Sequence, residues 1–181
     1  MQFNIRNIGK TFAIWLLFNL PIFAILTLGF ITGFLKIVFN DVTYITHFIF
    51  LLTLLTVFYT GYTSHLIDNN WNIIKFGVPV NRDEIMFDME KLLQFPKFMM
   101  NFVITLGFLG TIIGVIIGFQ TFPEGAFTDA IKMQEFVRQM LVGFSTELNS
   151  LLMGVFGKTW LSIIVYFQTD RLKLKLKRYI V

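Results

Sequence analysis

A few polar side chains lie within long uncharged stretches of this sequence, and these residues could do chemistry. Thr111 lies in the 22-residue run from Phe98 to Phe119, which has no formal charge. Ser150 and Lys158 lie in a second apolar stretch, at a spacing that keeps them near one side of a helix. Hydroxyl groups on two neighbouring helices can line a narrow hydrated path for an ion. A lysine deep in lipid costs roughly 2.5 to 3.5 kcal/mol, so Lys158 should face protein or water.

Small residues accompany these polar side chains at helical spacing. In lipid, such stripes let two helix backbones approach closely, because packing and not water exclusion drives association there. The glycines of the two stripes are Gly107, Gly110, Gly114 and Gly118, followed by Gly154 and Gly157. Two interpretations stay open: simple helix packing, or one wall of an ion pathway. The candidate pathway residues are Thr111, Asn149, Ser150, Lys158 and Thr159.

Composition places the chain in a membrane. Apolar residues make up 55% of its 181 residues, and charged residues only 14%, far from the composition of a soluble domain. The absence of cysteine excludes disulfides and thiolate metal sites. His47 and His65 are too far apart for ligand spacing, and a wet membrane interface explains both. We expect neither a cofactor nor an intramembrane enzyme, since no nucleophile and base lie at matching depth.

The order of apolar and polar stretches predicts one all-α integral membrane domain covering residues 1–181. We expect four transmembrane helices, at about 11–38, 43–67, 98–119 and 145–168. The loop 68–97 should contain a short cytoplasmic amphipathic helix from about Arg82 to Phe95, ended by Pro96. The segment 120–144 should contain a periplasmic interfacial helix.

Positive charges predict the orientation of the four spans. The amino-terminal segment, the loop 68–97 and the tail 169–181 would share one side, and together they hold eleven lysines and arginines. The other side would hold three. By the positive-inside rule both termini are cytoplasmic. The tail residues expected to contact anionic lipid, and not nucleic acid, are Arg171, Lys173, Lys175, Lys177 and Arg178.

Acidic residues are missing from the middle of the predicted spans. Asp41, Asp68 and Glu147 all lie at or near span ends. A proton or sodium pathway usually needs an ionisable carboxylate within the membrane. If this chain conducts ions, we expect another subunit to supply that carboxylate.

Two segments resemble the MotA/TolQ/ExbB proton-channel family. Leu106 to Phe119, LGFLGTIIGVIIGF, is similar to the family signature L-G-x-x-G-T-x-x-G. Gly143 to Gly154, GFSTELNSLLMG, resembles the segment G-I-S-x-A-L-x-T-T-x-x-G at the start of the family's final span. The resemblance implies a homopentamer in a bacterial inner membrane, around a dimer of a single-span MotB/TolR/ExbD-like partner. An aspartate in the partner's membrane helix would carry H⁺ or Na⁺, and ion flow would drive rotation.

The resemblance also assigns individual residues. Thr111 matches the threonine of the first motif, and Ser150 falls on the first threonine of the T-T pair, whereas Leu151 replaces the second and has no hydroxyl. Lys158 is not part of the family pattern. The matching glycines are Gly107, Gly110 and Gly114. The loop 68–97 is too short for the rotor-contacting domain of flagellar members, so we expect a compact motor for another load; the alternative is a non-conducting oligomeric scaffold.

Overall fold

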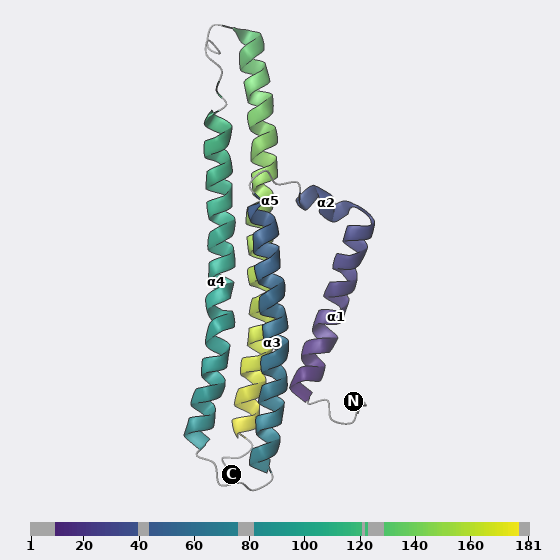
Figure 1. Ribbon diagram of the computed structural model, residues 1–181, viewed down its shortest axis with the longest axis vertical. Coiled ribbons are helices and arrows are strands. Elements are labelled where there is room, and N and C mark those ends of the chain that lie inside the picture. The colour runs from purple at the N-terminus through teal and green to yellow at the C-terminus, as the bar shows by residue number, and fades with distance from the viewer. Residues whose placement is uncertain (1–9, 40–43, 76–81, 121, 123–128, 178–181) are drawn as a thin grey trace.

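Five helices account for nearly all of the part of the chain that the structure describes. This computed structural model describes residues 10–39, 44–75, 82–120, 122 and 129–177, and contains no strand in those ranges. The helices are α1 (Lys10–Ile31), α2 (Phe34–Val38), α3 (Ile45–Lys75), α4 (Arg82–Gln120) and α5 (Ala130–Lys177) (Figure 1). All except α2 are long and apolar enough to cross a membrane, which agrees with the predicted all-α membrane class with four spans.

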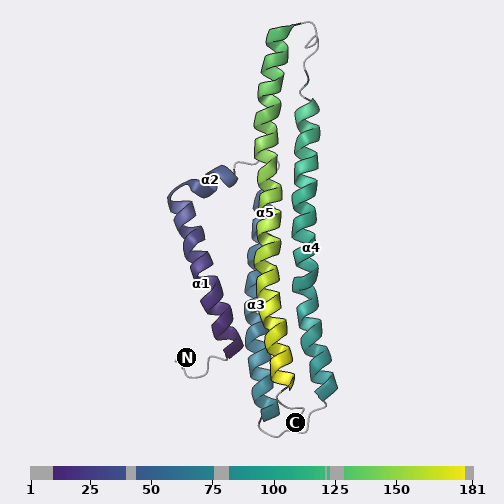
Figure 2. The same ribbon diagram turned by 180° about the vertical axis from the view of Figure 1, so that it is seen from behind.

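The helices α4 and α5 form an antiparallel pair that makes the most extensive interface of the molecule. The helix α3 packs against both, and α1 lies outside, mainly against α3 (Figures 1 and 2). The start of α1 and the end of α5 lie at one end of the molecule, here called the terminal end (Figure 1). At the opposite end, here called the hairpin end, α4 and α5 extend beyond α1 and α3.

The first predicted span, 11–38, is too long, because α1 ends at Ile31. Gly33 has φ +76°, a left-handed conformation that breaks a helix and that glycine adopts without steric cost. The five residues of α2 then run across the direction of α1 (Figure 1). The uncharged sequence continues through this break, so hydropathy alone could not reveal it.

Pro96 does not end a helix, contrary to the sequence prediction. No separate helix ends before it, since α4 is continuous from Arg82 to Gln120. A proline inside a helix removes one hydrogen bond and costs about 3 kcal/mol. Leu93, Met99 and Val103 are each at most 6% exposed on the packed face of α4, and their burial offsets this cost.

The segment 120–144 is likewise not a separate interfacial helix, because α5 is continuous from Ala130 to Lys177. Phe136, near the start of α5 at the hairpin end, is buried, and the centroid of its ring lies 4.6 Å from that of Phe122. Ile131 and Leu141 on the same part of the helix remain exposed. No proline lies within α5, so nothing in its backbone chemistry forces a break between Ala130 and the rest of the helix.

Buried polar pairs fix α1 against the other helices. The Asp68 carboxylate of α3 accepts hydrogen bonds from the backbone N–H groups of Thr11 (3.3 Å) and Phe12 (2.9 Å). Further along, the Trp160 indole N–H donates to Asn19 Oδ1 at 2.8 Å. The first N–H groups of a helix have no partner within the helix, and an anion favours the positive end of its dipole. Asp68 therefore caps α1 from a neighbouring helix.

Beyond these contacts α1 diverges from α5 (Figure 2). An apolar groove lies between the two helices. The groove has a volume of about 500 Å³. Its walls come from three helices and include Ile22, Leu26, Leu35, Met153 and Phe156. The contact between α1 and the rest of the chain is thus concentrated toward the terminal end.

We predict that Asp68→Ala lowers the thermal stability of the detergent-solubilised protein more than Asp68→Asn. Loss of a capping side chain costs about 0.5 to 2 kcal/mol, and asparagine keeps one acceptor oxygen for the α1 amides. Melting temperatures of the two variants measure the difference. Equal melting of the alanine variant and the parent would contradict the capping role.

Candidate functional site

The two glycine stripes meet where α4 crosses α5, and the backbones touch there. A Cβ atom added at Gly107 would lie 2.9 Å from the Ser150 carbonyl oxygen and 3.2 Å from the Gly154 Cα. One added at Gly154 would lie 2.9 Å from the Val103 carbonyl oxygen. Such distances are closer than side chains tolerate, so only glycine fits both positions. We call the contact of Gly107 with Ser150 and Gly154 the glycine seam.

The remaining glycines differ in what they contact. A Cβ at Gly110 would lie 2.8 Å from that of Ser150, and one at Gly114 would overlap the Glu147 side chain. Gly157 faces α3 instead of α4, against the Thr53 hydroxyl. Gly118 has no described neighbour within 4 Å of an added Cβ. The glycine stripe of α4 is therefore in close contact with α5 over only part of its length.

The two candidate hydroxyls lie beside the glycine seam and are bonded within the chain. Thr111 Oγ1 is 3.1 Å from the Gly107 carbonyl oxygen of its own helix and 3.2 Å from the Glu147 carbonyl oxygen of α5. Ser150 is fully buried, and its Oγ lies 3.0 Å from Thr46 Oγ1 of α3. Thr111 and Ser150 thus lie on neighbouring turns of the same interface, with Ser150 directed toward α3.

Glu147 lies beside these hydroxyls and was not among the residues predicted for the site. Its side chain is 3% exposed and fills the space that the missing side chain of Gly114 leaves. A long side chain packed opposite a glycine of the facing helix is a common way to fill the space between two helices. Pairing Glu147 with Gly114 in advance, however, would have required the register of α4 against α5, which cannot be derived from the sequence. The structure places this carboxyl group one turn from Ser150, toward the hairpin end.

The other candidates lie farther along α5 or at its surface. Lys158 is half-buried and Thr159 is exposed, whereas Asn149 is half-buried near Ser150. Lys158 follows Gly154 by one turn and precedes Ser162 by one turn, and Ser162 Oγ contacts Met100 Sδ of α4 at 3.4 Å. Because both flanking residues face α4, Lys158 lies along the same interface. No acceptor for its ammonium group is found within the described part of the chain.

The predicted membrane-surface anchor is only partly described. Arg171 is half-buried and Lys173 is exposed near the terminal end. Lys175 and Lys177 belong to the last turns of α5, and Arg178 lies outside the described residues. Their contact with lipid remains a prediction.

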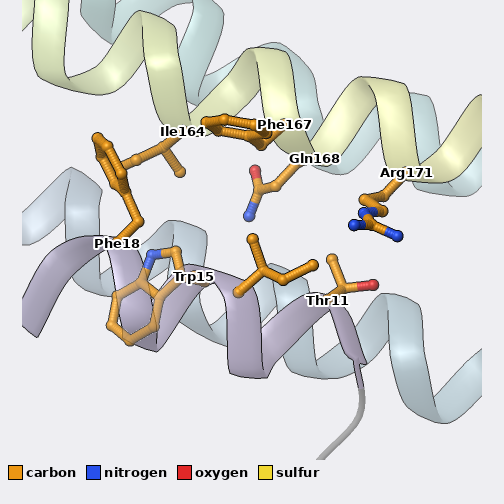
Figure 3. Close-up of a pocket in the computed structure, with 8 residues that line it drawn as sticks. Thr11, Trp15, Phe18, Ile164, Phe167, Gln168 and Arg171 are labelled. Carbon is orange, nitrogen blue, oxygen red and sulfur yellow. The ribbon is translucent and has the colours of Figure 1, made fainter.

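A second polar cluster joins α1, α3 and α5 nearer the terminal end. The Gln168 amide donates to the Thr60 carbonyl oxygen and to Ser64 Oγ, both at 2.6 Å. The Trp15 indole N–H donates to Thr60 Oγ1 at 3.0 Å. Figure 3 shows Gln168 pointing from α5 toward α1, between Phe167 and Arg171. The cavity beside it measures about 10 Å³, which is at most the volume for one water molecule, and the hydrogen bonds of this cluster hold α1, α3 and α5 together.

Metal-binding chemistry has no support in the residues that the structure describes. No group of three potential ligands comes together there. The His47 ring is tilted against that of Phe39, with ring centroids 4.9 Å apart, and His65 makes an edge contact with Phe12. Both histidines therefore lie beside aromatic rings, and each contacts a different part of the chain.

The geometry above defines a class, an all-helical chain with four candidate membrane spans and a glycine-packed pair of long helices. Comparisons with protein-family models, curated proteins and solved structures find no match to this chain.

We predict that Gly107→Ala destabilises the protein and that Gly118→Ala does not. The added methyl group at 107 meets backbone atoms of α5 that cannot rotate away, and overpacking of this kind costs about 1 to 3 kcal/mol. At 118 the same methyl group meets no described neighbour, which makes it a matched control on the same helix. Thermal unfolding in detergent compares the two, and similar melting temperatures would show that the glycine seam tolerates separation.

Proposed function

We propose that this chain is the pore-forming subunit of an ion-driven rotary motor in a bacterial inner membrane. Copies of the chain, five by resemblance, surround a dimer of a single-span partner. An aspartate in the partner's membrane helix carries H⁺ or Na⁺, and ion flow turns one component relative to the other. Both termini lie in the cytoplasm, on the side that the excess of basic residues indicates.

The observation that carries this proposal is the register of the two segments that resemble the MotA/TolQ/ExbB family. They lie on antiparallel helices, and Gly107 and Thr111 of the first directly oppose Ser150 and Glu147 of the second. This alignment follows from the helix packing and is independent of the sequence resemblance. It supports a shared ion site formed by α4 and α5.

The absence of an acidic residue from the middle of the predicted spans supports the requirement for a partner subunit that supplies one. Glu147 lies opposite Gly114, beyond the glycine seam toward the hairpin end, at the start of the apolar part of α5. Asp68 is engaged with the first turn of α1. An ion crossing the membrane needs an ionisable or polar site in the central region as well, and in this proposal the partner's aspartate provides it.

A non-conducting scaffold is the second candidate, and one observation favours it. The hydroxyls of Thr111 and Ser150 each have an acceptor or a hydroxyl partner inside the chain. Hydrogen bonds between helices of this kind stabilise membrane proteins without any transport role. In a scaffold, the same residues would set only helix spacing.

The partner provides the most direct test. The chain should co-purify with the product of a neighbouring gene that encodes one apolar span containing an aspartate. Replacing that aspartate with asparagine should abolish proton or sodium flux into vesicles while the complex still forms. A stable assembly that contains no such subunit in any preparation would refute the motor and favour the scaffold.

We predict that Thr111→Val reduces ion flux of the complex by about tenfold or more while assembly persists, because valine keeps the volume and removes the group that could contact an ion. Thr27→Val is the matched control, since the Thr27 hydroxyl on α1 also bonds a carbonyl of its own helix, that of Phe23. Flux in reconstituted vesicles and size-exclusion profiles measure both effects. Equal flux in the parent and both variants would assign Thr111 to packing.

A further inference from the structure

The apolar groove between α1 and α5 is walled by hydrocarbon side chains from three helices. Ile25 of α1, Leu35 of α2 and Leu152 of α5 each form part of its lining. Thr32 is the one polar side chain among the described residues that line it, and its hydroxyl donates to the Leu28 carbonyl oxygen at 2.9 Å. No lining side chain therefore keeps a hydrogen-bond donor for a ligand. A molecule that occupies the groove must be apolar over the part that it inserts.

The groove is bounded at both of its ends. Toward the terminal end, the Trp160 ring lies against those of Phe23 of α1 and Phe156 of its own helix, with centroids 5.7 Å and 5.5 Å apart. Toward the hairpin end, α2 runs from the end of α1 toward α5 (Figure 2). A Cβ atom added at Gly29 would lie 3.0 Å from Leu35 Cγ, so this leucine of α2 packs directly on α1. The groove is therefore a bounded pocket and not a continuous furrow.

The length of the groove matches one leaflet of a bilayer. Its lining positions run from Ile22 in α1 to Thr32 directly after that helix, a rise of about 15 Å. That is half of a hydrocarbon layer of about 30 Å, and therefore the depth that one acyl chain covers. A membrane-spanning helix of another subunit needs the full layer of about 30 Å, so it can place only some of its side chains in this groove. The volume of about 500 Å³ lies within the range of about 300 to 1,000 Å³ that is usual for ligand sites.

Lys36 supplies a positive charge beside the groove. It is the charged residue of α2 and follows Leu35, which lines the groove. Lys36 is exposed, and it lies in the connection between the candidate spans that end at Ile31 and begin at Ile45. A connection between two spans lies at a membrane surface, where a lysine attracts the phosphate of an anionic lipid. The charge and the apolar pocket thus match the two parts of a phospholipid.

We propose that the apolar groove is a binding site for an anionic phospholipid, with an acyl chain between α1 and α5 and the phosphate beside Lys36. The acyl chain makes the dispersion contacts that α1 and α5 do not make with each other over this stretch. A phospholipid with a zwitterionic headgroup fits the same pocket but gains less from Lys36. The inference goes beyond the proposed function, and it applies to a motor subunit and to a scaffold alike.

Lipid titration of the full chain tests the site. Delipidated protein in detergent is titrated with phosphatidylglycerol, or with phosphatidylcholine that carries the same acyl chains. Native mass spectrometry counts the lipid molecules bound per chain. The first phosphatidylglycerol should bind about fivefold more tightly than the first phosphatidylcholine, because one lysine near an anionic headgroup contributes on that scale.

Two substitutions that fill the groove locate the bound lipid. Leu152→Trp should weaken binding of the first phosphatidylglycerol by about tenfold or more, because the indole takes the space of the acyl chain. Leu55→Trp on α3 is its matched control, since Leu55 is 57% exposed against 58% for Leu152 and does not line the groove. Ile25→Trp fills the groove from α1, and Leu20→Trp on the same helix is the control outside it. Only variants that keep the elution volume of the parent are compared.

Lys36→Gln tests the headgroup contact separately from the groove. This variant should bind phosphatidylglycerol about fivefold more weakly than the parent, because the glutamine has no charge to attract the headgroup. Its binding of phosphatidylcholine should stay unchanged, so the preference between the two lipids should disappear. The apolar lining is untouched by this substitution, since Lys36 is not one of the residues that line the groove.

Three outcomes would overturn the lipid site. Equal lipid binding by the groove-filling variants and their controls would show that the lipid binds elsewhere. Equal affinity of the parent for the two lipids would show that no charge selects the headgroup. Because the chain has no cysteine of its own, efficient disulfide formation between copies of Leu152→Cys in native membranes would make the groove a contact between subunits. These readouts need no partner subunit, so they remain separate from the co-purification test of the motor.

Discussion

The backbone contact of Gly107 with Ser150 and Gly154 is the constraint on which the other features of this molecule depend. Two helices this close need glycine where their backbones touch, and this requirement fixes the register in which they pack. The register in turn decides that Thr111 meets the Glu147 carbonyl, that the Glu147 side chain covers Gly114, and that Ser150 reaches Thr46. The site is therefore a consequence of the crossing.

A second constraint is that polar side chains inside a membrane need hydrogen-bond partners. Two different arrangements of polar side chains occur in this chain. Inside the helix bundle, polar side chains pair with one another, as Asn19 does with Trp160 and Gln168 with Ser64. On the outer face of α4, polar side chains have no such pairing within the described chain. In a membrane the first arrangement is complete in one subunit, and the second requires neighbours or enclosed water.

Hydropathy was sufficient to predict the helical membrane class and the four spans, because about twenty apolar residues have few other stable structures in lipid. It failed at the ends of the helices. The left-handed turn at Gly33 lies in an uncharged stretch, and Pro96 is accommodated because the face of α4 around it is packed. For the candidate site, spacing identified the glycines and hydroxyls, whereas Glu147 and the Thr46 contact of Ser150 depend on the register between helices. The roles proposed for Thr111, Ser150 and Lys158 stay predictions.

The apolar groove between α1 and α5 leaves the packing of this chain incomplete without its surroundings. Protein interiors are packed as densely as organic crystals, and a single copy of the chain leaves a space of about 500 Å³ lined by Ile22, Leu26 and Phe156 unfilled. In a membrane, acyl chains or a helix of another subunit would fill it. The position of α1 would then depend on that occupant as well as on Asp68 and Asn19.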